Sequence, residues 1–239
     1  MTNTLNQSLA SLVLTTHQVV PVLEKYNLDF CCKGKRLLTD ACREQGLDAE
    51  LISREIEQVL APENSKMMPF SEMSAEQLIG HILIHHHFYV RQSMPTILGH
   101  LEKVAEKHGD RFPYMKEVLS LFREIRTDMT QHMNKEEAVL FPMIKDLEKA
   151  SQAGPGNSGT IFSVLGPISV MEAEHELAGE ILFRIRALTN TYSAPQGACT
   201  TFRLCLTELK EFEDDLHQHV HLENNILFPR AQAMRRQTA

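Results

Sequence analysis

The sequence predicts an all-α protein, a four-helix bundle preceded by a small helical domain. Apolar residues recur every three or four positions along most of the chain, and no stretch alternates with the period of two that a strand requires. Breaks rich in Gly, Ser and Pro, namely SQAGPGNSG from Ser151 and SAPQG from Ser193, separate long periodic stretches. In addition, one helical motif occurs twice. Together these observations favour helices joined by loops and exclude a sheet as the main architecture.

We expect two domains, a small helical one at residues 1–65 and the bundle at residues 66–239. The stretch APENS from Ala61 has the composition of a linker between them. Ser74 and Gln77 predict a capping box at the start of the first long helix. Proline removes a helical hydrogen bond, so we expect Pro142 and Pro229 to end or kink their helices. The expected long helices cover residues 74–107, 113–148, 167–190 and 198–234.

Composition limits the classes of function. The net charge is −7, and no basic cluster stands out except Arg235 with Arg236, which gives nucleic-acid binding little electrostatic support. No apolar run approaches the ~20 residues of a membrane span. The first residues lack the features of a secretory signal, so we expect a cytoplasmic protein. Five cysteines, two of them adjacent, make a poor disulfide framework and fit a reducing compartment.

An internal repeat carries the most specific chemical signal. The pattern H-x-x-x-E-x-x-x-L-F-P occurs at residues 132–142 and again at residues 219–229. His87 and His175 precede the two copies at nearly equal distances. Each half of the bundle therefore has one helix with a single histidine and one helix with a His and a Glu four residues apart. A pseudo-symmetric metal site requires this kind of two-fold repeat.

The repeated polar residues fall on apolar helix faces. Residues four apart lie on one face of a helix, so each motif directs an imidazole and a carboxylate to one point. On the second helix the expected inward series is Val118, Phe122, Ile125, Met129, His132, Glu136, Val139 and Met143. A buried, unpaired carboxylate costs on the order of several kcal/mol, and cations would remove that cost. Imidazole and carboxylate ligands together suit iron or manganese.

We therefore expect two metal ions bridged by two glutamates. The expected ligands are His87, His132, Glu136, His175, His219 and Glu223. The simplest division places His87 and His132 on one ion and His175 and His219 on the other. His86 competes with His87 for its place, and the apolar stripe favours His87. His217 and His221 point off the seam, so we interpret them as surface residues.

Two further features remain open at this level. Glu174, next to His175, is either a group that supports the metal site or carries protons or substrate, or a solvated helix charge. Cys31 and Cys32 precede Lys33-Gly34-Lys35, and nearby lysines favour the reactive thiolate form. The alternative is that both are ordinary reduced cysteines.

Four segments of the chain carry a resemblance to a known family. They are YNLDFCCKGKRLL, HMNKEEAVLFPMIK, GPISVMEAEHELAGE and DDLHQHVHLENNILFPRA. The resemblance extends over nearly the whole chain, and the four motifs occur in the family's order. The sequence resembles the RIC (repair of iron centres) family, of the YtfE/ScdA type. The resemblance implies a hemerythrin-like four-helix bundle holding two non-haem iron ions, with an oxo bridge in the oxidised state. The ligands carried over by position are the same six residues, with Glu136 and Glu223 as bridges.

The resemblance also implies a function. A cytoplasmic di-iron protein of this kind restores iron–sulfur clusters damaged by nitrosative or oxidative stress, by iron donation, by binding nitric oxide and reducing it to nitrous oxide, or by both. It implies that Cys31 and Cys32 act in redox chemistry or iron transfer. The implied partners are damaged iron–sulfur proteins or cluster-assembly proteins, nitric oxide as a small ligand, and a second copy of the chain in a homodimer, with neither nucleic acid nor membrane.

The alternative function is an oxygen- or redox-sensing hemerythrin-like binding module. Oxygen-carrying hemerythrins use a fifth histidine four residues after the one on the third helix, and that position is Gly179 here. A missing ligand leaves a metal position open. This suits nitric oxide, or an iron that must be released, better than reversible oxygen carriage.

Overall fold

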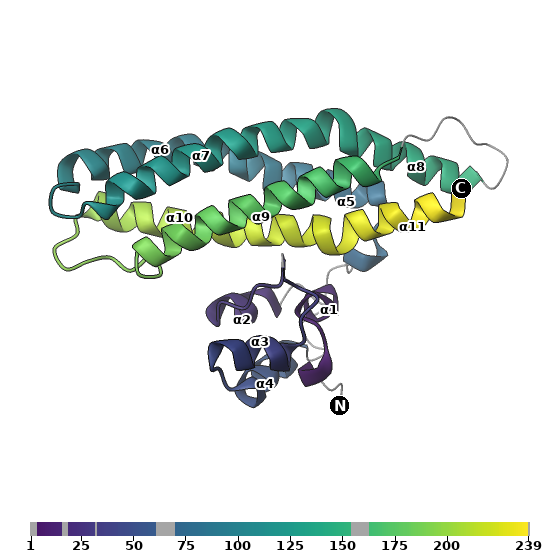
Figure 1. Cartoon of the computed structure of the whole chain (residues 1–239), viewed down its shortest axis with the longest axis horizontal. Helices are drawn as coiled ribbons and strands as arrows, with labels where there is room; N and C mark the ends of the chain where they lie inside the picture. The colour runs from purple at the N-terminus through teal and green to yellow at the C-terminus, as the bar shows by residue number, and fades with distance from the viewer. Residues whose placement is uncertain (1–3, 16–18, 32, 61–69, 154–162, 239) are drawn as a thin grey trace.

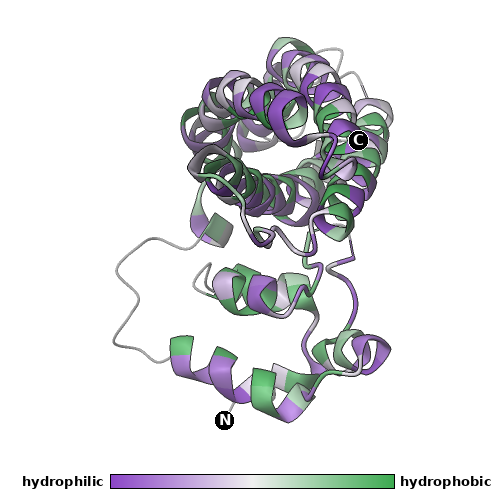
Figure 2. Ribbon diagram, turned by 90° about the vertical axis from the view of Figure 1, so that its left-hand side faces the viewer, coloured by the Kyte–Doolittle hydropathy of each residue, from purple (hydrophilic) through white to green (hydrophobic). Residues whose placement is uncertain are grey.

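Helices make up the regular secondary structure of the residues that the computed structural model describes, which are 4–15, 19–31, 33–60, 70–153 and 163–238 (Figure 1). The described residues contain no strand, so the all-α prediction is confirmed. A long bundle lies beside a smaller group of short helices. Figure 2, a view along the bundle, shows its helices arranged around a common axis with the small domain on one side.

The small domain consists of short helices that depend on each other for stability. They are η1 (Thr4–Asn6), α1 (Leu9–Thr15), α2 (Val20–Lys25), α3 (Leu38–Gln45) and α4 (Ala49–Val59). Isolated helices of this length are unstable in water, so packing must hold them. Leu9, Leu38 and Ile52 are fully buried in their shared core. Gly46 ends α3 with a φ of 68°, a left-handed conformation that glycine adopts at little cost.

Four rods form the bundle, and three of them contain a π-helical segment. Rod one consists of α5 (Ala75–His81), η5 (Ile82–His87) and α6 (Phe88–His108), and rod two of α7 (Tyr114–Lys135), η6 (Glu136–Leu140) and α8 (Phe141–Ala153). Rod three is the single helix α9 (Leu165–Leu188). Rod four consists of α10 (Thr200–Leu222), η7 (Glu223–Leu227) and α11 (Phe228–Thr238). The predicted capping box of Ser74 and Gln77 opens rod one. None of these helices is long and apolar enough to cross a membrane.

The π-helical segments change what the prolines do. We expected Pro142 and Pro229 to end or to kink their helices, and neither proline ends its rod. Each proline is the second residue of an α-helix that continues directly from a π-helical segment, η6 or η7. There the N–H of Phe141 donates to the oxygen of Glu136, five residues back, so the wider turn precedes the proline. Both segments begin at one of the two predicted bridging glutamates.

The wider turn also shifts the inward face of rod two. Beyond Glu136 the buried residues are Leu140, Phe141 and Ile144, whereas Val139 is 50% exposed. The expected inward position of Val139 is therefore wrong. A regular α-helical period cannot anticipate the shift, because a π-turn adds one residue to the rotation between successive buried positions.

The buried apolar residues form two clusters along the bundle. One contains Val90, Met129, Leu182 and Leu216, together with the small domain's core, and the other contains Ile79, Ile144, Ile168 and Leu227. Along each rod, the predicted metal ligands lie where the residues of one cluster give way to those of the other. The six polar side chains therefore lie in the middle of the bundle, with apolar packing on both sides.

The small domain docks on the face of the bundle formed by α9 and rod four. The ring of Phe30, 1% exposed, lies 5.6 Å from that of His221 and 6.2 Å from that of His217. The side-chain amide of Asn225 donates to the backbone oxygens of Phe30 and of Cys31, at 3.3 and 3.2 Å. These contacts join two parts of the chain that are far apart in sequence.

The interpretation of His217 and His221 as surface residues is wrong. His221 is only 2% exposed and His217 is partly covered, because the small domain covers this face of α10. Burial lowers the pKa of His221 to about 4. Periodicity within one helix cannot show that a second domain lies over its outer face.

Candidate metal centre

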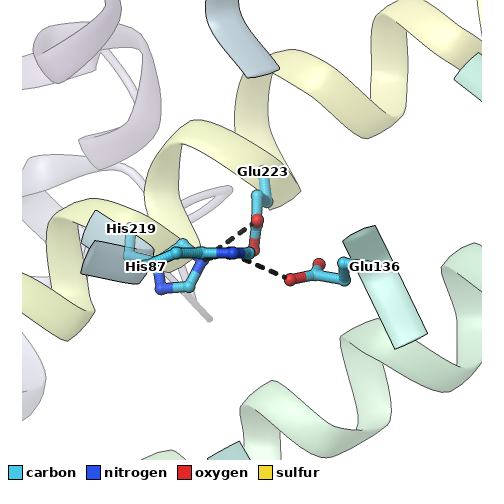
Figure 3. A group of neighbouring side chains, drawn as sticks. All are labelled: His87, Glu136, His219 and Glu223. Atoms are coloured by element: carbon cyan, nitrogen blue, oxygen red, sulfur yellow. Dashed lines mark hydrogen bonds and ion pairs between the residues drawn. The ribbon is translucent and has the colours of Figure 1, made fainter. Parts of the chain in front are cut away.

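The six predicted ligands meet in the middle of the bundle. Each is at most 1% exposed, and they are His87, His132, Glu136, His175, His219 and Glu223. All four rods contribute at least one of them. Figure 3 shows four of these side chains converging from three rods. The internal repeat thus corresponds in space to one compact cluster.

Among the described residues, two groups of four have ligand atoms close enough to hold one ion each. His87 and His219 form one group with both glutamates, and His132 and His175 form the other with the same two glutamates. The Nε2 atoms of His87 and His219 are 3.2 Å apart, and those of His132 and His175 are 3.0 Å apart. The expected division, which joined His87 with His132, is wrong.

The packing of the rods explains this division. α6 lies against both α7 and α10, but η5, the segment of rod one that carries His87, lies against α10, and α7 lies against α9. A histidine therefore meets its partner from the other half of the repeat rather than its neighbour within the same half. Sequence spacing places each histidine on the inner face of its rod, but the choice of partner depends on which rods are adjacent across the bundle.

Each glutamate touches both groups. Oε2 of Glu136 lies 3.3 Å from Nε2 of His87 and 3.3 Å from Nε2 of His132. Glu223 lies 3.1 Å from Nε2 of His175 through Oε2 and 3.0 Å from Nε2 of His219 through Oε1. A carboxylate in this position is suited to bridging two ions.

The cluster fits cations better than hydrogen bonds. Within the described part of the chain, neither oxygen of Glu136 has a well-aligned hydrogen-bond partner, and Oε2 of Glu223 also lacks one. Such buried orphan atoms are costly unless an ion satisfies them. In addition, metal–imidazole bonds are about 2.1 Å long, so two nitrogens at a right angle on one ion lie ~3.0 Å apart. The observed separations of 3.2 and 3.0 Å agree with that spacing.

The electrostatics of the site keep both carboxylates ionised. Burial and the charge of Glu223 would raise the pKa of Glu136, but His132 and His87 hold it below its ordinary value. Burial would likewise raise the pKa of Glu223, and His219 and His175 hold it well below its ordinary value. Ionised carboxylates are the form that binds a metal ion.

Outer partners fix the orientation of three of the four imidazoles. Nδ1 of His87 lies 2.7 Å from Oε1 of Glu137, and Nδ1 of His175 lies 2.9 Å from Oδ1 of Asn224. An acceptor at Nδ1 keeps the proton there and leaves the lone pair of Nε2 free for a metal. Sequence reasoning missed both partners. The signal was present, because each is the residue directly after a shared glutamate in the repeat.

Glu174 supplies the third such partner. Its Oε2 lies 3.0 Å from Nδ1 of His132, and its Oε1 pairs with the ammonium of Lys135. The carboxylate is 26% exposed, so it connects a buried histidine with the surface. Of the two open interpretations, this position favours a group that supports the site over a solvated charge.

The remaining candidates lie outside the two groups. His86 belongs to neither group and pairs with Asp215 at 2.9 Å, while its ring stacks on that of His219. Cys31, 5% exposed, donates its thiol hydrogen to Asp29 at 3.3 Å and is in neither group. Cys32 lies outside the described residues. The roles expected for both cysteines stay predictions.

Comparison with known proteins agrees with this geometry. Residues 78–231 match the family model described as Hemerythrin HHE cation binding domain, and residues 5–60 match ScdA_N, described as a domain of unknown function. Together with the buried cluster, the first match fits a di-iron centre and confirms the cofactor prediction.

Curated relatives match almost the full length. The chain is 38% identical to the iron-sulfur cluster repair protein YtfE of Dickeya chrysanthemi over 95% of this chain and 96% of the relative. It is 38% identical to that of Cronobacter sakazakii and 35% identical to that of Shigella boydii, each over 95% of this chain and 97% of the relative. The chain belongs to the hemerythrin HHE cation-binding family and, within it, to the family of the iron-sulfur cluster repair protein YtfE.

Proposed function

We propose that this chain repairs iron–sulfur clusters damaged by nitrosative or oxidative stress, and that it does so from the di-iron centre in the middle of its bundle. The observation that carries the proposal is a pair of four-ligand groups sharing both glutamates. The relatives that match over nearly their full length are iron–sulfur cluster repair proteins, which supports the same proposal. The proposed place of action is the cytoplasm, and the proposed partners are damaged iron–sulfur proteins or cluster-assembly proteins.

The donor set supports a centre that exchanges ligands. Each group offers two imidazoles and two shared carboxylates, four side chains in all. Gly179, one helical turn after His175, supplies no donor atom. When bound, two irons would supply redox chemistry and open positions for a small ligand, which we propose to be nitric oxide. Reduction of nitric oxide to nitrous oxide is the proposed enzymatic version of the function.

The chain's own residues can manage protons at the site. Glu174 holds Nδ1 of His132 at 3.0 Å and contacts the ammonium of Lys135 near the surface. As a metal ligand His132 is neutral, and its remaining ring proton sits on Nδ1, where the carboxylate of Glu174 accepts it. The buried cluster otherwise excludes water with apolar residues on both sides.

The decisive experiment joins metal analysis with a repair assay. Protein purified without oxygen is analysed for metal by mass spectrometry, and a Mössbauer spectrum is recorded after exposure to nitric oxide. The same sample is then incubated with an iron–sulfur enzyme inactivated by nitric oxide, and recovery of that enzyme's activity is measured. The Glu136→Gln chain serves as the matched control.

Each outcome has a distinct meaning. Two irons per chain, and recovery that fails with the control, would support repair. Steady nitrous oxide production with an electron donor would identify the enzymatic version. Two bound irons without any recovery would refute repair, and a long-lived oxygen adduct of the reduced protein would then favour the sensing module. Zinc or no metal would refute the whole proposal.

A further inference from the structure

A cavity lies between the small domain and the bundle, on the side of the metal centre. Its volume is about 390 Å³, within the range of small-molecule sites. The small domain contributes Cys31 and Lys35 to its lining, and the bundle contributes Glu172, Glu176, Asn224 and Asn225. The cavity therefore exists only while the small domain is docked. None of the proposed functions above makes use of it.

The cavity is built for a molecule rather than for a single ion. The ligand atoms of Cys31, Glu172 and Glu176 do not come close enough together to hold one cation, since the two groups within the described residues that meet this condition are both in the bundle centre. The volume also exceeds that of one ion and its water shell. An organic ligand with several hydrogen-bonding groups fits these dimensions better.

The lining defines the chemistry of that ligand. Lys35 offers a cation to a carboxylate, while Glu172 and Glu176, one helical turn apart on α9, offer anions to an ammonium group. The amides of Asn224 and Asn225 offer neutral donors and acceptors. Cys31 adds a thiol, the group that exchanges with another sulfur. A zwitterionic molecule that carries sulfur matches all four features.

We propose that this cavity binds a low-molecular-weight zwitterionic thiol and its disulfide, of the γ-glutamyl-cysteinyl-glycine type, and that the bound disulfide exchanges with Cys31. This inference goes beyond the proposed repair function and stands independently of it. It assigns Cys31 a small-molecule partner, where the resemblance suggested only redox chemistry or iron transfer.

The exchange balances without a further reactant. The sulfur of Cys31 attacks one sulfur of the bound disulfide, whose S–S bond breaks while a new S–S bond forms to Cys31. Cys31 is oxidised to the mixed disulfide, and the departing half is reduced to a thiol. The proton of Cys31 leaves to the carboxylate of Asp29, which it already faces at 3.3 Å, and is returned to the departing sulfur. A second thiol molecule reverses the step.

Two adjacent asparagines connect the cavity with Cys31 on one side and with the metal centre on the other. Asn225 donates to the backbone oxygen of Cys31 and so fixes the cysteine at the cavity wall. Asn224 accepts from Nδ1 of His175, one of the predicted metal ligands. A ligand in the cavity therefore touches one residue that positions the thiol and one that positions the metal centre.

The test compares two disulfides on the iron-loaded full-length chain in a Cys32→Ser background. Oxidised glutathione carries the required charges, and oxidised 2-mercaptoethanol carries none. Adduct formation at each cysteine is followed by mass spectrometry of digested samples. Cys199 serves as an internal control, because it is exposed and lies at the far end of α10, ~34 Å along a helix of 23 residues.

We expect oxidised glutathione to be preferred at Cys31 and not at Cys199. Lys35→Glu and Glu176→Lys should each reduce that preference roughly two- to fivefold, the range for partly exposed charge pairs. Neither substitution should change the rate at Cys199. Circular dichroism and iron content must match those of the parent chain, so that a folding defect is recognised.

A second measurement needs no variant in the cavity. S-methylglutathione has the charges of the ligand but cannot exchange, and it should slow alkylation of Cys31 by iodoacetamide while leaving that of Cys199 unchanged. Equal preference for the two disulfides at Cys31 would overturn the proposal. So would a preference that survives both charge reversals, or an absence of protection by S-methylglutathione.

Discussion

Glu137 and Asn224 occupy the same position in the two halves of the repeat, each directly after a shared glutamate, and each holds Nδ1 of a histidine on a neighbouring rod. The distances are 2.7 Å from Glu137 to His87 and 2.9 Å from Asn224 to His175. One partner is a carboxylate, which Arg91 also contacts at 2.6 Å, and the other is a neutral amide. The two halves are therefore alike in geometry and different in charge.

Removing either outer partner should weaken metal binding. We expect Glu137→Ala and Asn224→Ala each to lower iron affinity about 10–100-fold, because the imidazole loses the acceptor that fixes its tautomer. Competition with a chromophoric chelator measures the affinity. Glu208→Ala is the matched control, since Glu208 also pairs with a histidine, His100 at 2.6 Å, outside the centre. Unchanged affinity in both variants would refute the role of these partners.

Removing a shared glutamate should affect both ions at once. Glu136→Ala and Glu223→Ala should each lower the iron content below two ions per chain, because each carboxylate contacts one histidine from each of the two groups. Metal analysis by mass spectrometry of protein purified without oxygen provides the measurement. His217→Ala, on the same helix as His219 but in neither group, should keep two irons. Full iron content in either glutamate variant would show that the bridging assignment is wrong.

The docking of the small domain should depend strongly on Phe30. Its ring is 1% exposed and packs against the rings of His217 and His221. We expect Phe30→Ala to lower the free energy of unfolding by about 3 kcal/mol, the low end for a buried phenylalanine. Urea denaturation measures the change. Leu51→Ala, at a position 43% exposed, should change it by less than about 0.5 kcal/mol. Equal effects would contradict the packing described.

The interface between the small domain and the bundle should also make the free energy of unfolding depend on pH, through Glu24 on α2. Burial and the negative charges of Asp214 and Glu213 raise the pKa of Glu24 from 4.5 to about 8. The positive charges of Lys210 and Arg186 oppose this shift without cancelling it. Between these values the folded chain keeps a proton that the unfolded chain releases. The contribution of Glu24 to the free energy of unfolding is therefore fully present at low pH, and it is lost as the pH rises from 4.5 to about 8.

Glu24→Gln should remove this dependence, because the amide stays neutral. The variant should match the parent at about pH 4 and resist urea better at about pH 9. The difference between the two urea midpoints at each pH isolates this group from all others that titrate. Glu102→Gln, an exposed carboxylate on the bundle that pairs with Arg123, is the control and should show no such difference. A constant difference across this range would contradict the prediction.

Several features required the folded chain. The partner of each histidine depends on which rods are adjacent, and both orders of pairing are compatible with the same repeat. The burial of His217 and His221 depends on a domain nearly two hundred residues away in the sequence. The π-helical segments that begin at Glu136 and Glu223 rotate the face that follows, so Val139 becomes exposed although a regular helix would bury it.

The sequence by itself determined the helical class, the four rods and the six residues that converge on the centre, because helical periodicity and a duplicated motif are local properties of the chain. Only the tertiary structure decided how the histidines pair, which outer residues hold them, and that a cavity forms beside Cys31. The physical reason is that these depend on contacts between segments distant in sequence. Spacing along a helix fixes the direction of a side chain, but not what it meets.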